Sequence, residues 1–140
     1  MARILTFCFT LMFLGCMDTS ISEADLHYLN GYWEIAEVEF PDGATKEYTV
    51  NTNIDFIQLE DGKGFRKKLQ PKFDGSYGTS HDAELFTINL SNDIITMHYA
   101  SDFNDWEEKL VQLDSMSFSV INAEGIQYRY KRFQPIVIPK

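Results

Sequence analysis

The sequence predicts an all-β protein, an antiparallel up-and-down meander of about eight to nine short strands that closes into a barrel. Apolar and polar residues alternate with a period of two over residues 30–40 and 65–69 of the 140-residue chain. Short segments rich in Asp, Asn and Gly separate the alternating stretches, and helical periodicity never extends beyond a turn or two. Tight turns between successive strands favour a meander, and closure removes its exposed edges.

The first long strand is expected over residues 30–40. Trp33 and Ile35 alternate with a glutamate, and the apolar phase then shifts by one residue so that Ala36 and Val38 continue the pattern. A change of phase within a strand is typical of a β-bulge or a sharp coil.

Turn chemistry sets the limits of the later strands. Pro41-Asp42-Gly43-Ala44 and Asp61-Gly62-Lys63-Gly64 are typical turn sequences. Residues 71–82 form the longest irregular stretch, and residues 25–29 form one helical turn or simply lead into the first strand. The strands expected after the first are residues 46–50, 54–59, 65–69, 85–90, 94–99, 106–113, 118–121 and 126–133.

The N-terminus has the features of an export signal over residues 1–15. Arg3 precedes an uncharged run over residues 4–14, which as a helix spans about 16 Å, too short to cross a membrane comfortably. A basic start, a short apolar run and a small residue at its end are typical of a cleaved signal peptide.

Phe13-Leu14-Gly15-Cys16 resembles the lipobox of bacterial lipoproteins, in which Gly precedes the lipidated Cys. The resemblance implies cleavage before Cys16, transfer of diacylglycerol to Cys16 and addition of a further acyl chain such as palmitate to the new amino terminus. We then expect residues 16–28 to form a tether, residues 29–134 the barrel and residues 135–140 a tail. The alternative is an ordinary secreted protein in which Cys16 is incidental. Several acyl chains would hold the protein on a membrane almost permanently.

Removal of the signal defines the charge and the thiol content of the mature chain. Cys8 leaves with the signal, so no free thiol, disulfide or cysteine ligand remains beside a lipidated Cys16. The mature chain has 11 Lys and Arg against 21 Asp and Glu, a formal charge of −10. Such a chain repels phosphate backbones, so we expect no nucleic-acid partner, and the anchor rather than charge provides membrane association.

Leu29-Asn30-Gly31-Tyr32-Trp33 resembles the start of the first strand in lipocalin-like lipoproteins of Bacteroidota, in which Gly-x-Trp is the common element. The final segment, residues 128–133, is similar to their aromatic and basic last strand. The resemblance implies a lipocalin-like barrel in which Trp33 closes one end and a basic residue, Arg132 or Arg129, lies across its ring. The Arg-x-Tyr clamp of the fatty-acid-binding branch has no match, so a fatty-acid ligand is not implied.

The candidate ligand-binding residues are Tyr128, Tyr130, Met97 and Tyr99. Each pair shares a face of its strand, and inward faces would give an aromatic lumen with a few polar groups, suited to a small hydrophobic or amphipathic molecule. The alternative is a small barrel whose own side chains fill the interior.

Other features of the sequence also bear on its function. Arg66, Lys67, Lys68 and Lys72 form a basic cluster, which is either an anion-binding patch or a solvated strand that protects an edge. Asp114-Ser115-Met116 resembles the O-glycosylation motif of Bacteroidota. No His, Asp or Ser pattern matches a metal site or a nucleophile, so we expect no enzyme, no metal and no cofactor. The histidines are His27, His81 and His98.

Two functions follow from these expectations. The first is a lipid-anchored protein of the cell envelope, facing the periplasm from the outer membrane, that binds or carries a small hydrophobic or amphipathic ligand. The second is an adaptor or inhibitor lipoprotein with a filled barrel, whose loops, chiefly residues 71–82, bind a protein partner.

Overall fold

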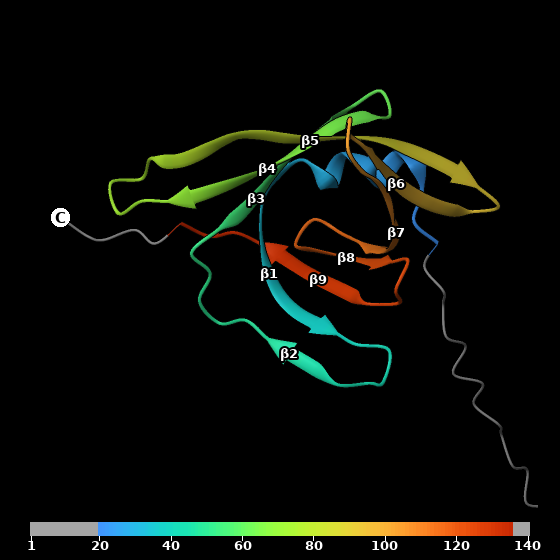
Figure 1. Ribbon diagram of the computed structural model, residues 1–140, viewed down its shortest axis with the longest axis horizontal. Coiled ribbons are helices and arrows are strands. Elements are labelled where there is room, and N and C mark those ends of the chain that lie inside the picture. Colours follow the sequence, from blue (N-terminus) through green and yellow to red (C-terminus); the bar gives the residue numbers. More distant parts are fainter. Residues whose placement is uncertain (1–19, 136–140) are drawn as a thin grey trace, which may run out of the picture.

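Nine antiparallel strands follow one another around a single sheet in the computed structural model, which describes residues 20–135 (Figure 1). A 3-10 helix, η1 (Glu23–Leu29), precedes them. The strands are β1 (Gly31–Glu39), β2 (Thr45–Glu47), β3 (Ile54–Glu60), β4 (Lys63–Pro71), β5 (Tyr77–Ser91), β6 (Ile94–Ala100), β7 (Asp105–Leu113), β8 (Ser117–Asn122) and β9 (Gln127–Arg132).

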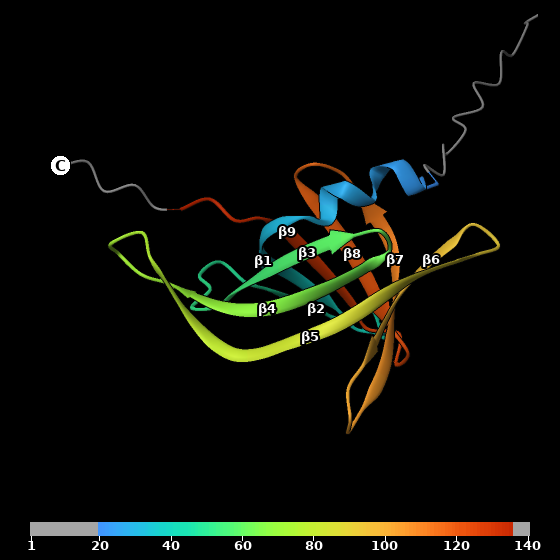
Figure 2. The same cartoon turned by 90° about the horizontal axis from the view of Figure 1, so that it is seen from above.

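Eight of these strands form a closed barrel, because β9 returns to pair with β1. The ladder runs from Trp33 opposite Arg132 to Glu39 opposite Gln127. The short β2 is an extra strand that pairs only with the last three residues of β1. The all-β, antiparallel meander and its closure are therefore confirmed (Figures 1 and 2).

The change of apolar phase in the first strand corresponds to an irregularity in the β1–β9 ladder. The register shifts between Ile35 and Glu37, so Ala36 has no partner on β9. Because of this shift, Ile35 and Val38 lie opposite Tyr130 and Tyr128, on the same face of the sheet. The predicted β-bulge is confirmed, and it allows β1 to curl between β3 and β9.

The predicted irregular stretch over residues 71–82 is wrong. β4 runs to Pro71 and β5 begins at Tyr77, so only residues 72–76 form the turn between them. Gly78 has a weak intrinsic preference for strands, but pairing with Gln70 of β4 holds it extended.

The expected strand over residues 46–50 is also shorter in the structure. β2 ends at Glu47, because β1 offers only three residues with which it pairs. Of the two alternatives for residues 25–29, the structure has the helical one, extended to seven residues.

The two ends of the barrel differ in their covering, because η1 lies at only one of them. The turns β3–β4, β5–β6 and β7–β8 lie at the same end as η1, which we call the helical end. The turns β4–β5, β6–β7 and β8–β9 lie at the opposite end, which we call the far end. Leu26 and Leu29 of η1 are buried in the main core at the helical end, against residues that include Trp33 and Ile57.

The outer face of the sheet also carries a group of aromatic side chains. Tyr32 stacks on Tyr77 at 5.2 Å between ring centroids and contacts Phe56 at 4.9 Å, and Phe56 in turn contacts Phe65. We call Tyr32, Phe56, Phe65 and Tyr77 the outer aromatic cluster. It lies on the face of β3 and β4 that also carries the buried Ile54 and Leu69.

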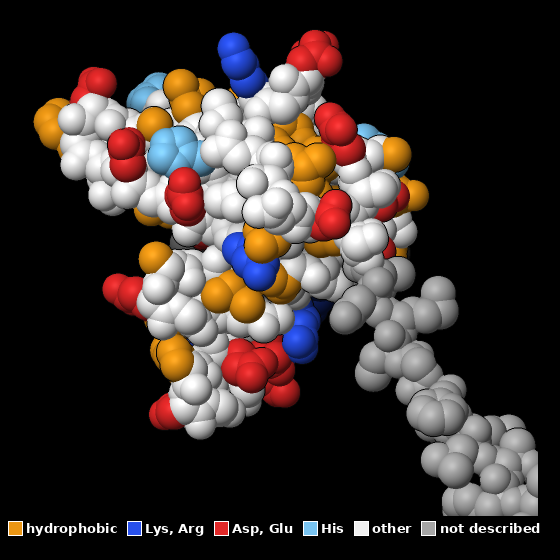
Figure 3. Space-filling view, turned by 90° about the vertical axis from the view of Figure 1, so that its right-hand side faces the viewer, with side chains coloured by type: hydrophobic (Ala, Val, Ile, Leu, Met, Phe, Trp, Pro, Cys, Tyr) orange, Lys and Arg blue, Asp and Glu red, His pale blue; other side chains and the backbone are white. Residues whose placement is uncertain are grey.

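Acidic side chains are spread over the surface rather than gathered in one patch, as on the face drawn in Figure 3. Apolar side chains form small groups between them. Between residues 20 and 135, no helix has both the length and the apolar character needed to cross a membrane.

Candidate ligand-binding site

The helical end of the barrel is sealed by Trp33 and Arg132, the pair expected to close it. Trp33 is fully buried, and its Nε1 donates a hydrogen bond to the carbonyl of Leu29 at 2.8 Å. The Arg132 guanidinium lies 3.7 Å from the centroid of the indole ring. Its Nη1 donates to the carbonyl of Asn30 at 2.7 Å and its Nη2 to that of Tyr28 at 2.9 Å. The pair therefore ties the last strand to the segment between η1 and β1.

Gly31 of the Gly-x-Trp motif has a direct role in this closure. Its φ is +121°, a conformation that residues with a Cβ rarely adopt, and a Cβ there would lie 2.6 Å from Arg132 Nη1. Glycine thus lets the guanidinium reach both the indole and the neighbouring carbonyls.

The four candidate ligand-binding residues lie inside the barrel, in contact with other core side chains. Met97, Tyr99 and Tyr130 are buried and Tyr128 is half-buried. Tyr130 stacks on Phe118 at 4.6 Å, and Tyr99 stacks on Trp106 at 4.8 Å. These contacts fill the middle of the barrel, and none of the cavities described below is lined by any of the four.

A layer of polar side chains lies across the interior on the far-end side of this core. On three strands a polar residue occupies the inward position next to an apolar one: Asp55 beside Ile57, Tyr99 beside Met97, and Glu108 beside Leu110. Arg66 joins them from β4 and Tyr130 from β9. We call Asp55, Arg66, Tyr99, Glu108 and Tyr130 the polar layer.

Arg66 is the centre of the polar layer. Its Nη2 donates to Asp55 Oδ2 at 2.8 Å and to Tyr130 Oη at 2.6 Å. Its Nη1 lies 3.5 Å from Glu108 Oε2. The side chains of Arg66 and Asp55 are only 8% and 3% exposed, so this is a buried ion pair. Breaking such a pair by removing one partner costs about 3–5 kcal/mol.

Three buried side-chain atoms of the layer have no hydrogen-bond partner among residues 20–135: Asp55 Oδ1, Arg66 Nε and Tyr99 Oη, of which Asp55 Oδ1 forms an ion pair with Lys68 Nζ. An unsatisfied buried polar group costs about 1–3 kcal/mol, and such groups are often found where a protein binds something. The layer therefore has spare hydrogen-bonding capacity.

Burial and the neighbouring positive charges shift the pKa values of the carboxylates of the layer in opposite directions. Burial alone would raise the pKa of Asp55, but the charges of Arg66 and Lys68 outweigh it and hold that pKa below its usual value. For Glu108 the effect of burial is larger than the effect of the Arg66 charge, so the pKa of Glu108 is raised. Burial also raises the pKa of Tyr130, to about 12. Glu108 is thus the member of the layer that takes up a proton most easily.

A polar cavity lies at the far end, next to this layer. Its volume is about 350 Å³, and its lining consists of Asn53, Lys68, Gln70, Gly78, Thr79 and Ser80. Lys68 joins the cavity to the layer, because its Nζ pairs with Asp55 Oδ1 while its side chain remains 60% exposed. A ligand group in this far-end cavity would meet an ammonium, amides and hydroxyls.

The expectations that the basic cluster forms one patch and that its strand is an edge are wrong, and anion binding by its members stays a prediction. β4 lies between β3 and β5 and is not an edge, and the four residues do not form one patch. Arg66 is buried in the barrel, Lys67 occupies the outward face of β4, and Lys72 lies in the turn beyond it. The buried Asp55 within the apolar segment 54–59 was the sequence signal for a buried cation, since a buried carboxylate requires a partner.

The other residues singled out in the sequence are Ser115, the histidines and Cys16. Ser115 is exposed in the β7–β8 turn, and its carbonyl accepts a hydrogen bond from Arg132 Nε. His98 pairs with Glu107 on the outer surface. Among residues 20–135, no three His, Cys, Asp or Glu side chains are grouped as metal ligands would be. Cys16 and the signal segment lie outside the described residues.

Two comparisons with known proteins found a similarity. Residues 29–120 match the sequence model of a family described as a lipocalin-like domain. A solved lipocalin-like protein from Bacteroides uniformis ATCC 8492 is similar, with a TM-score of 0.48 and 14% identity, over 76% of this chain and 99% of that chain. No curated protein matches. Because the family match spans more than half of the chain, this protein belongs to the lipocalin-like domain family.

Proposed function

We propose that this protein is a lipid-anchored lipoprotein of a bacterial cell envelope whose barrel binds the polar group of a small amphipathic molecule at its far end. Family membership supports a capacity for ligand binding. The deep interior is filled by Tyr99, Tyr130 and Met97, so the ligand binds above them and not between them.

The position of Lys68 is the main observation that supports this proposal. Lys68 lines the far-end cavity, remains accessible, and pairs with the buried Asp55. A carboxylate or another hydrogen-bonding group of a ligand would pair with the Lys68 ammonium and approach the unpartnered groups of the polar layer. The apolar part of the ligand would remain toward the opening of the cavity.

The test is native mass spectrometry of the full protein purified from its own host. We expect a small amphipathic molecule to copurify with the unmodified protein and to be lost from Lys68→Met. Lys67→Met is the matched control, because Lys67 is the neighbouring residue on the outward face of the same strand. Absence of any small molecule from the unmodified protein, or equal loss from both variants, contradicts the proposal.

A protein partner is the second candidate, and one observation favours it. Phe73 in the β4–β5 turn is 92% exposed and Phe103 in the β6–β7 turn is 99% exposed, both at the far end. Exposed aromatic side chains of this kind are frequent anchors of protein interfaces. If this candidate is correct, Phe73→Ser abolishes a cross-link to a partner in the host, and Lys68→Met leaves that cross-link intact.

The proposed anchor has its own test. Cys16→Ser should leave the signal uncleaved or release the protein from the membrane fraction. Mass spectrometry of the unmodified protein should show the added mass of diacylglycerol and an acyl chain on Cys16. Unchanged fractionation of the variant together with the absence of lipid mass contradicts lipidation.

A further inference from the structure

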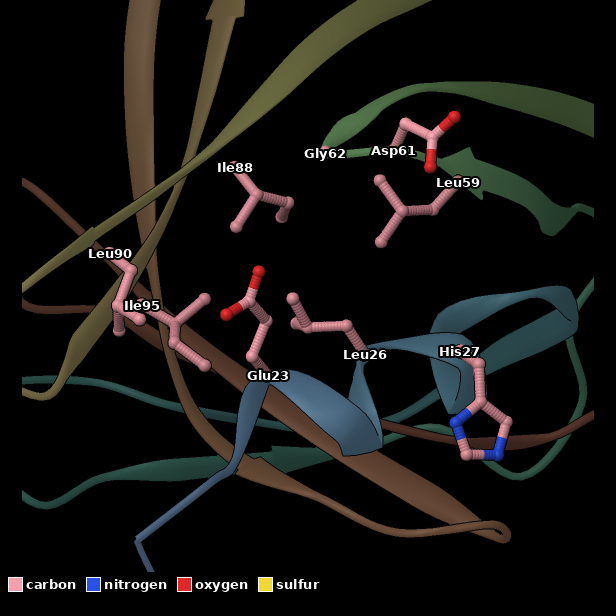
Figure 4. A pocket seen from close by; sticks show the side chains of 9 residues that line it. All are labelled: Glu23, Leu26, His27, Leu59, Asp61, Gly62, Ile88, Leu90 and Ile95. Carbon is pink, nitrogen blue, oxygen red and sulfur yellow. The ribbon is translucent and has the colours of Figure 1, made fainter.

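A second cavity lies at the helical end, beneath η1, and has no part in the function proposed above. Its volume is about 310 Å³, within the range of small-molecule sites. It is bounded by η1, the β3–β4 turn, the end of β5 and the start of β6 (Figure 4). Its lining consists of Glu23, Leu26, His27, Leu59, Asp61, Gly62, Ile88, Leu90 and Ile95.

The walls of this helical-end cavity are aliphatic. Leu26 and Ile95 belong to the buried core, and Leu59 and Ile88 pack against that core. Leu90 is 54% exposed at the rim. A short hydrocarbon chain in the cavity would cover these groups and be removed from water, which favours binding.

One carboxylate points into this aliphatic space. Figure 4 shows the side chain of Glu23 rising from η1 with its carboxylate between Leu26 and Ile95, facing Ile88. Glu23 forms no ion pair with any residue between 20 and 135. It is the only charged group that Figure 4 shows directed into the middle of the cavity.

Glu23 is exposed to solvent, and the other polar groups of the lining do not neutralise its charge. Asp61, in the β3–β4 turn, adds a second carboxylate at the rim. The His27 ring turns away from the cavity, and its Nδ1 lies 2.7 Å from the carbonyl of Ala24. Neither Lys nor Arg lines the cavity. Its chemistry is thus complementary to a cation with a short apolar body.

We propose that the helical-end cavity binds a small organic amine, with the ammonium group at Glu23 and an alkyl chain against Leu26, Leu59, Ile88 and Ile95. The formal charge of −9 for the whole chain raises the local concentration of such cations. This site is separated from the far-end cavity by the filled core, so the two sites bind independently.

Three probes of equal chain length test the proposal with the full protein: hexylammonium, hexanol and hexanoate, each titrated by NMR at low salt. We expect hexylammonium to bind best and hexanoate worst. Glu23→Gln should weaken hexylammonium binding roughly fivefold, the upper range for an exposed ion pair, and leave hexanol binding unchanged. Glu124→Gln is the control, because Glu124 is an exposed glutamate in the β8–β9 turn at the other end of the barrel.

A second variant tests the cavity itself. Ile88→Phe fills the space and should abolish the binding of both hexylammonium and hexanol, with the fold checked by the circular dichroism of the aromatic residues. Lys68→Met should leave all three affinities unchanged, which separates this site from the far-end cavity. Equal affinity for hexanoate and hexylammonium, no loss on Glu23→Gln, or no binding at all overturns the proposal.

Discussion

Arg132 connects three segments of the helical end through a single side chain. Its guanidinium covers the indole of Trp33 and donates hydrogen bonds to the carbonyls of Tyr28, Asn30 and Ser115. A planar group with five N–H donors suits this task, since an ammonium could not satisfy three carbonyls and an aromatic face in one geometry. We therefore expect the role to be specific to arginine rather than to positive charge.

Arg132→Met should lower the free energy of unfolding by about 2–3 kcal/mol. The cation–π contact contributes about 0.5–2 kcal/mol, and the three carbonyls lose charged donors. Urea denaturation followed by tryptophan fluorescence measures the change. Arg129→Met is the matched control on the same strand, because its half-exposed pair with Glu37 should contribute less than about 1 kcal/mol. A similar loss in both variants contradicts this role of Arg132.

The location of the charged residues could not be predicted from alternation alone. The pattern over residues 65–69 correctly separates Phe65 and Lys67 from Arg66 and Lys68, but it does not say which face is inside. Apolar Phe65 would normally be assigned to the interior, yet it lies outside in the outer aromatic cluster. Arg66 lies inside because Asp55, 11 residues away, and Tyr130, 64 residues away, compensate for its burial. Such distant partners leave no signal within residues 65–69, and the signal lies instead in Asp55 within the apolar segment 54–59.

At the scale of the strand, the residues typical of tight turns predicted where strands end better than the amino-acid composition of a segment did. Asp61-Gly62 and Asn92-Asp93 all have positive φ, as a two-residue hairpin turn requires, and both turns lie where their sequences indicated. By contrast, the composition of residues 77–82 suggested a loop. These residues are part of β5, because the first half of that strand pairs with β4 as far as Pro71. Pairing between strands decided the structure there, and pairing cannot be read from one segment.

Gly64 marks a close contact between two strands and the core. Its Cβ would lie 2.5 Å from the carbonyl of Gln58 and 2.6 Å from Phe86 Cζ. Gly64→Ala should therefore destabilise the protein by about 1–3 kcal/mol, as overpacking does. Gly78→Ala is the control, since the nearest atom to its Cβ is 3.6 Å away. We expect thermal unfolding to show little change or a small gain for that variant, and a similar loss in both would exclude packing as the cause.

At the scale of the whole molecule, the polar layer makes stability depend on pH in two opposite directions. The lowered pKa of Asp55 stabilises the fold above about pH 4, and this contribution is lost as the pH falls further. The raised pKa of Glu108 acts with the opposite sign, because its stabilising effect is present below its usual value of 4.5 and is lost as the pH rises through its raised value. Above the raised pKa of Glu108, its ionised carboxylate therefore destabilises a barrel that Asp55 stabilises.

Glu108→Gln should separate these two contributions. The amide keeps the shape of the side chain and removes its charge, so the midpoint of thermal unfolding should rise relative to the unmodified protein at pH 7. At pH 4 and below, where Glu108 is largely protonated, the difference between the two proteins should shrink toward zero. Glu124→Gln in the exposed β8–β9 turn should shift the midpoint little at either pH. A gain for Glu108→Gln that is the same at both pH values would mean that packing, and not the charge of Glu108, separates the two proteins.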